Sequence, residues 1–305
     1  MTSTTDIKAI IRRHRTRDAA FAVLGMVCLL VCIATLMALL VDLAIDGVGR
    51  LSPGFLTSFP SRFPGKAGIL SAWVGTILVM LVTALAAVPL GVAAGIYLEE
   101  YARKNWLTTI IEINIANLAG VPSIVYGLMA LGLFVYQFHL GQSILTAGLT
   151  LALLILPIVI IATRESIRAI PGSIREAAYA LGATKWQAIK HHVLPYSTGG
   201  ILTGVIIGLS RAIGESAPLI TIGALTFIAF LPPAPVQRTF PFVNFDWLAS
   251  PFTVMPIQLF NWVSRPQQAF HLNAAAAGLV LMAMTLAMNG IAIYVRYHSR
   301  KRIKW

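Results

Sequence analysis

Long uninterrupted apolar stretches dominate the pattern of hydrophobic and polar positions. We count six, at about 19–41, 69–98, 107–137, 143–163, 199–229 and 272–295. A bilayer core of roughly 30 Å needs about 20 apolar residues per helical crossing. A transmembrane β-barrel would instead show alternating segments of about 10 residues. The pattern therefore predicts an all-α integral membrane protein with six transmembrane helices.

Two of the stretches need interpretation. Asn114, Asn117, Gly120 and Pro122 interrupt the third, and since two separate crossings there would each be too short, we expect one broken or bent span. Arginines before the first stretch resemble the start of a signal peptide, but the apolar run is too long and no small-residue cleavage site follows before Asp42. We expect a retained transmembrane helix.

The distribution of Lys and Arg sets the orientation. Seventeen of the 23 lie on one side: the N-terminal tail, the segment after 98, the loop after 163 and the C-terminal tail. The opposite loops hold five: Arg50, Arg62, Lys66, Arg238 and Arg265. Because Lys and Arg favour cytoplasmic loops, both termini are expected in the cytoplasm, with the chain in a plasma (inner) membrane.

These boundaries divide the chain into regions. We expect a basic cytoplasmic tail at 1–18, a first helix with an outer loop at 19–68, a transmembrane domain at 69–297 and a second basic tail at 298–305. Within the domain lie a cytoplasmic loop, 164–198, and an outer loop, 230–271, with seven of the sixteen prolines. A structureless loop of that length is uncommon, so we expect a rigid cap. The cap is either a lid over the bundle or a docking surface for an outside partner, and the sequence does not favour one over the other.

Composition and missing motifs narrow the function. The chain is 57% hydrophobic and 11% charged, against about 25% charged in soluble domains. The net charge of +12 reflects topology and attraction to anionic membrane lipid, and no basic face with interleaved aromatics predicts nucleic-acid binding. There is no phosphate-binding P-loop, metal-binding His-Glu-x-x-His or nucleophile elbow. We expect neither enzymatic activity nor a metal or other cofactor in this chain.

One segment of the cytoplasmic loop carries a specific motif. Glu176-Ala177-Ala178, Gly182 and Leu194-Pro195 follow one another at fixed gaps, with Pro171-Gly172-Ser173 as a helix start. The order resembles the Glu-Ala-Ala loop of ABC importer permeases, with His192 at a usually hydrophobic position. The resemblance implies a MetI-like permease core whose coupling helices dock on a separate ATPase through Glu176, Ala177, Ala178 and Gly182, so that ATP and Mg²⁺ are bound by that partner.

The fifth stretch contains two charges. Arg211 lies 12 residues beyond Gly199, which is about 18 Å along a helix and therefore near the centre of the bilayer. A charged side chain at that depth costs at least ~2.5–3.5 kcal/mol of insertion free energy. Glu215 is one turn further and can pair with it, while Gly214 and Pro218 loosen the helix. The pair either only pins helices together or lines an anion pathway, since the Arg fork matches tetrahedral oxyanions.

Two sequences narrow the resemblance. Arg211-Ala-Ile-Gly-Glu-Ser-Ala-Pro-Leu219 and Asn117-Leu-Ala-Gly-Val-Pro-Ser-Ile-Val-Tyr-Gly-Leu128 look like the phosphate-specific permeases, of the PstA type. This implies a heterodimer with a PstC-type permease, two PstB-type ATPase subunits and an outer PstS-type phosphate-binding protein. Arg211 and Glu215 are then translocation-pathway residues.

Alternatives remain at this point. A permease for sulfate or molybdate would need the same arginine, and selectivity can reside in the binding protein. An ion-driven carrier or channel would need no ATPase, but it would show two internally repeated halves with matching broken helices. We see no such repeat.

Overall fold

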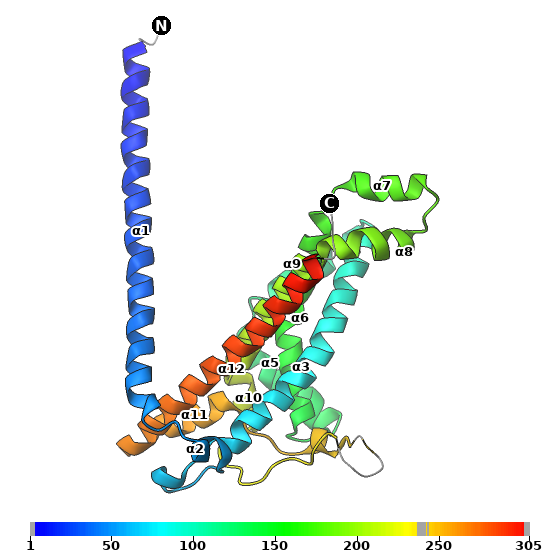
Figure 1. The fold of residues 1–305 in the computed structure, drawn as a ribbon. Helices are drawn as coiled ribbons and strands as arrows, with labels where there is room; N and C mark the ends of the chain where they lie inside the picture. Colours follow the sequence, from blue (N-terminus) through cyan, green and yellow to red (C-terminus); the bar gives the residue numbers. More distant parts are fainter. Residues whose placement is uncertain (1–3, 237–241, 243, 302–305) are drawn as a thin grey trace.

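The computed structural model describes residues 4–236, 242 and 244–301. Within them the chain forms helices and no β-strand (Figure 1). Five helices are long and apolar enough to cross a membrane, and a bent helix pair raises the number to six. The expected all-helical class is confirmed. Arg238 and the end of the C-terminal tail, 302–305, lie outside the described residues.

The long helices carry the membrane-spanning segments. They are α1 (Thr4–Val48), α3 (Leu70–Ile96), α6 (Ile144–Arg168), α9 (Leu194–Gly214) and α12 (Gln268–Lys301). The shorter α-helices are α2 (Pro53–Thr57), α4 (Trp106–Leu118), α5 (Ser123–Ala130), α7 (Gly172–Ala180), α8 (Lys185–Ala188), α10 (Ala217–Thr221) and α11 (Met255–Val263). Three π-helical segments extend them, η2 (Tyr97–Tyr101), η3 (Leu131–Gln137) and η4 (Ile189–Val193), and two 3₁₀ turns are η1 (Pro64–Lys66) and η5 (Asp246–Ala249).

Helix α6 is the centre of the bundle. Its most apolar window is 67% buried, compared with 39% for α3 and 11% for α12. It packs against both α3 and α9, which also contact each other. The helices at the edge therefore depend on α6 for their position.

Glycines make these two contacts close. On α3, Gly91 lies against Val159 and Gly95 against Thr163, while on α9 Gly204 lies against Ala162, all on α6. A methyl group at any of these glycines would overlap the facing side chain. Small residues at this spacing let helix backbones approach each other. Both glycine rows thus meet the same central helix.

Helix α1 stands apart from the bundle over most of its length (Figure 1). None of its apolar window is buried, and Cys28 and Cys32 are free and exposed there. It meets α12 only near its C-terminal end, where Gly47 lies against the backbone of Ala275. Just beyond, the Arg50 side chain donates to Asn273 Oδ1 over 2.6 Å. The exposed apolar surface of α1 is suited to lipid or to another subunit.

The two ends of the molecule are distinct. The start of α1, the end of α12 and the pair α7–α8 lie at one end, and α2 and α11 lie at the other (Figure 1). An even number of crossings produces this arrangement. The start of α1, the end of α12 and the Glu-Ala-Ala loop are therefore at the same end of the molecule, as the charge distribution predicts.

The third span is bent as expected. Helix α4 and the α5–η3 segment meet at an angle of 106°. Pro122 caps the second half with extended backbone, because proline restricts the preceding residue and cannot continue the helical hydrogen bonds.

The fifth span differs from the expectation at both ends. The helix begins at Lys185, not near Gly199, and runs without a break through η4 into α9. It ends at Gly214 and does not continue to 229. Glu215 is extended, with φ −76° and ψ 128°, and Pro218 has no N–H to donate to the Gly214 carbonyl. Arg211 consequently lies in the last turn of its helix.

The outer loop is ordered by packing against the bundle. Trp247, Phe252 and Trp262 are buried, and Trp262 packs against Phe55 and Phe270 with ring centroids 6.0 and 6.4 Å apart. The Ile144 N–H of α6 donates to the Ser250 carbonyl over 3.1 Å. The described part of the loop, which ends at α12 from Gln268, is a folded cap on the bundle.

The close approach of α9 to α6 generates a stability prediction. Replacing Gly204 with Leu should force these helices apart at a cost of about 1–3 kcal/mol. The melting temperature of the purified chain in detergent should fall by several degrees. Gly25→Leu is the matched control, because Gly25 on α1 has no neighbouring atom within 4 Å. Equal melting temperatures for both variants would contradict the packing role.

Candidate functional site

The break between α9 and α10 holds the pair of intramembrane charges. Arg211 lies in the last turn of α9, and Glu215 is the first residue after it. The Arg211 Nε donates to Glu215 Oε1 over 3.4 Å. The side chains retain 39% and 20% of their exposure. This is a loose, partly accessible ion pair, not a buried clamp between helices.

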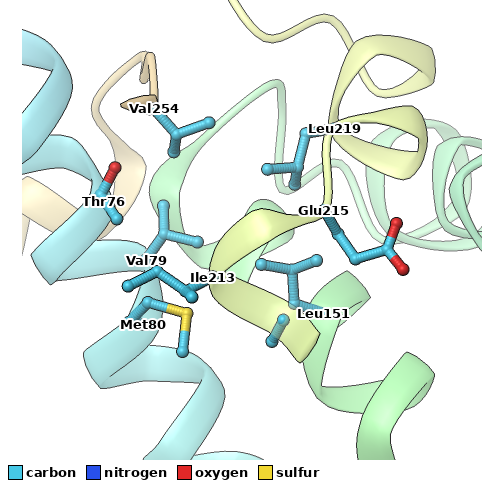
Figure 2. A pocket seen from close by; sticks show the side chains of 9 residues that line it. Thr76, Val79, Met80, Leu151, Ile213, Glu215, Leu219 and Val254 are labelled. Carbon is cyan, nitrogen blue, oxygen red and sulfur yellow. The ribbon is translucent and has the colours of Figure 1, made fainter. Parts of the chain in front are cut away.

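The surface behind the break is apolar and closed. Val79 and Met80 of α3, Leu151 of α6 and Ile213 of α9 line a pocket of about 10 Å³, the lower limit for one water molecule. Figure 2 shows the Glu215 carboxylate turned away from these side chains. The carboxylate of Glu215 therefore faces away from this apolar pocket.

The structure brings together the two segments, 117–128 and 211–219, whose sequences resemble phosphate-specific permeases. Helix α5 packs on α10, with Gly127 directly against Pro218 and Thr221. The buried Tyr126 donates its hydroxyl to the Leu118 carbonyl over 2.8 Å and is within electrostatic range of Arg211. Sequences about 90 residues apart thus form one unit around the break.

The Glu-Ala-Ala segment forms helix α7. Pro171 precedes its first turn, and Gly182 follows it with φ +80°, the left-handed conformation that glycine adopts without strain. Glu176, Ala177 and Gly182 are exposed, and Ala178 is buried under the turn, where its carbonyl accepts from Ala183 N. Three of the four predicted docking residues are therefore available to a partner.

Apolar side chains extend this exposed surface. Tyr179, Leu181 and Trp186 are 42%, 89% and 54% exposed. Between them the chain reverses, and Thr184 and Gln187 form a capping box that starts α8. Large exposed apolar side chains at the polar end of a molecule are typical of a protein interface.

A single continuous helix connects this surface to the charged pair. The segment Lys185–Gly214 has 30 residues, which corresponds to about 45 Å at 1.5 Å per residue. Pro195 interrupts its hydrogen bonding where the π-helix η4 gives way to α9. One helical element thus joins α8 to Arg211.

The structure also contains an ionic network that sequence reasoning missed. Glu99 and Glu100 at the end of α3, and Glu112 on α4, pair with Arg164, Arg168 and Arg175. Glu112 had no assigned role in the sequence analysis. The sequence did contain a signal for this network. Glu99 and Glu100 end one apolar stretch, and Arg164 and Arg168 end another. Charges at the ends of membrane spans require partners.

Comparison with known proteins identifies the family. Residues 87–304 match the family described as binding-protein-dependent transport system inner membrane component. The chain belongs to this family. It is therefore a multi-pass membrane component of a transport system.

Curated relatives are similar over nearly the whole chain. The probable ABC transporter permease protein YqgI of Bacillus subtilis is 32% identical, with 93% of this chain and 91% of the relative covered. The phosphate transport system permease protein PstA of Yersinia pestis is 32% identical, covering 95% and 92%. PstA 1 of Mycobacterium tuberculosis H37Rv is 30% identical, covering 80% and 73%. The resemblance to phosphate transport permeases of the PstA type is confirmed.

A solved structure shares the fold. The inward-facing MetNI methionine ABC transporter aligns with a TM-score of 0.54 at 12% identity, covering 74% of this chain and 93% of the other. The expected MetI-like fold is confirmed by this match.

Proposed function

We propose that this chain is the permease subunit of an ATP-driven importer that moves inorganic phosphate across the plasma membrane by alternating access. The observation that carries the proposal is the partly exposed Arg211–Glu215 pair at a helix break, packed beside α5. Broken helices with charged residues are common at transport sites. The similarity to PstA permeases supports phosphate as the substrate.

The chemistry of the pair fits a phosphate ion. The Arg211 guanidinium offers parallel N–H donors that match two oxygens of a tetrahedral oxyanion. Glu215 holds Arg211 in the absence of substrate. It also accepts a hydrogen bond from protonated phosphate, which sulfate at neutral pH does not offer.

Exposed surfaces of the chain support the expected partners. Some apolar side chains of α4 and α5, among them Ile113 and Leu128, are more than half exposed, and α5 packs on α10 next to the charged pair. A PstC-type permease covering them would close the pathway around Arg211. The α7–α8 surface receives one of two PstB-type ATPase subunits, which bind ATP and Mg²⁺, and the outer cap receives a PstS-type binding protein.

Substrate uptake tests the proposal directly. Cells lacking this chain and cells with the chain restored are compared for uptake of micromolar labelled phosphate, with unlabelled sulfate and molybdate as competitors. Dependence on the chain and indifference to both competitors are expected. Inhibition by sulfate or molybdate would assign the permease to another oxyanion, because the guanidinium of Arg211 matches any of these tetrahedral oxyanions.

Removing the central charge should stop transport. Arg211→Gln removes a charge-assisted contact worth about 1.5–3 kcal/mol, so uptake should fall by roughly 10- to 100-fold, since 1.4 kcal/mol corresponds to tenfold. The complex should still co-purify with its ATPase. Arg62→Gln is the control, because Arg62 is an exposed residue of the outer segment. Normal uptake by Arg211→Gln would exclude the anion role.

Reversing a charge on α7 should separate the permease from its ATPase. Glu176→Lys places a cation on the exposed docking face; uptake should be abolished and recovery of the ATPase with the permease should fall at least tenfold, because like-charge contacts at an interface cost several kcal/mol. Asp18→Lys, an exposed charge reversal on α1, should have no effect. ATP-driven uptake at the normal rate in Glu176→Lys would contradict docking through this residue.

A further inference from the structure

Helix α7 is tied to the membrane helices by one buried ion pair. Arg175 Nη2 and Nε donate to Glu100 Oε1 over 2.7 and 2.9 Å. Only 6% of the Glu100 side chain and 19% of the Arg175 side chain are exposed. Glu100 belongs to η2, the π-helical end of α3, so the pair joins two elements 75 residues apart.

The same arginine also reaches the end of α6. Its Nη1 donates to the Ile170 carbonyl over 2.9 Å, and its Nη2 to the Ile167 carbonyl over 3.1 Å. These carbonyls belong to the last turn of α6 and the linker after it. Helix α7 also packs on α8 and η4, which are part of the continuous helix Lys185–Gly214. Arg175 is thus the junction between α7, α3 and α6.

The neighbouring carboxylate extends the connection to α4. Glu99 Oε2 accepts from Arg168 Nη2 over 2.9 Å and lies 3.6 Å from Arg164 Nε. Arg164 Nη2 in turn lies 2.6 Å from Glu112 Oε1 on α4. Glu99, Glu112 and Arg168 border a polar cavity of about 310 Å³, so this outer part of the network has room to rearrange. The Glu100–Arg175 pair is largely buried and does not line that cavity.

We propose that Glu100 and Arg175 are positioning residues that transmit the movement of α7 to α3, so that the ATPase cycle moves α3 and α9 together. The inference rests on the proposed coupling to an ATPase. The continuous helix through α8 carries displacement to α9 and the charged pair. The Glu100–Arg175 pair carries the same displacement to α3, the second helix packed against α6. Without it, ATP hydrolysis continues while the pathway opens incompletely.

The ratio of substrate moved to ATP hydrolysed tests this role. The complete complex is reconstituted in liposomes, and phosphate uptake and ATP hydrolysis are measured on the same sample for wild type, Glu100→Ala and Glu100→Gln. Uptake per ATP should fall roughly tenfold, within the range of about 5- to 150-fold typical of coupling between sites. Hydrolysis and ATPase association should stay near the wild-type level.

A nearby acidic residue provides the matched control. Glu165 is 62% exposed and pairs with Arg168 on its own helix, so Glu165→Ala should leave the ratio unchanged. If uptake and hydrolysis decline together in the Glu100 variants, the pair is merely structural and the inference is wrong. An unchanged ratio would also overturn it.

Restoring the link by a different bond separates transmission from folding. In a Cys28→Ser/Cys32→Ser background, Glu100→Cys with Arg175→Cys should be uncoupled when reduced. Joining the two thiols with a short bifunctional thiosulfonate should recover most of the wild-type ratio. Persistent uncoupling after cross-linking would contradict the inference.

Failure of the proposed function gives a different result. A wild-type complex that takes up no phosphate with ATP contradicts the phosphate assignment by itself. The same variants are then scored with the oxyanion that the complex does carry.

Discussion

The close packing of α6 between two glycine-lined helices is the constraint on which the rest of the structure depends. Gly91 and Gly95 allow α3 to approach α6 closely, and Gly204 allows the same for α9. In lipid this contact gains little from the hydrophobic effect, so van der Waals packing and backbone approach must hold it. With α6 fixed in this way, its outer end supports the cap at Ser250, and its inner end presents Arg164 and Arg168.

Two features convert this frame into a device that can pass movement across a membrane. The first is the unbroken helix from Lys185 to Gly214, which joins the α7–α8 surface to Arg211. The second is the break after Gly214, where the chain is extended and Glu215 turns away from the bundle core (Figure 2). One helical element therefore connects the exposed α7–α8 surface with the charged pair. The family to which the chain belongs is one of membrane components of transport systems.

Much of the fold was predictable because lipid imposes simple rules on sequence. Every backbone polar group in a bilayer must be satisfied within the chain, so apolar stretches predicted helices, and Pro122 predicted the bend of 106°. The motif from Glu176 to Gly182 predicted a short helix ended by glycine, and Gly182 does adopt φ +80°. The extension of the fifth span to 229 was wrong, because hydrophobicity continues past Gly214 while helical hydrogen bonding does not.

The sequence by itself determined the helical type of the spans, the placement of the start of α1, the end of α12 and α7 at one end of the molecule, and the i, i+4 proximity of Arg211 and Glu215. Each follows from interactions within one or two turns or from the preference of a residue type for lipid or water. Only the tertiary structure decided that α5 packs on α10, and that Glu99 meets Arg168 and Glu100 meets Arg175, 69 and 75 residues away. From the sequence alone, several arginines are equally suitable partners for Glu99 and Glu100. The choice among them depended on which helix ends the packing around α6 brought together.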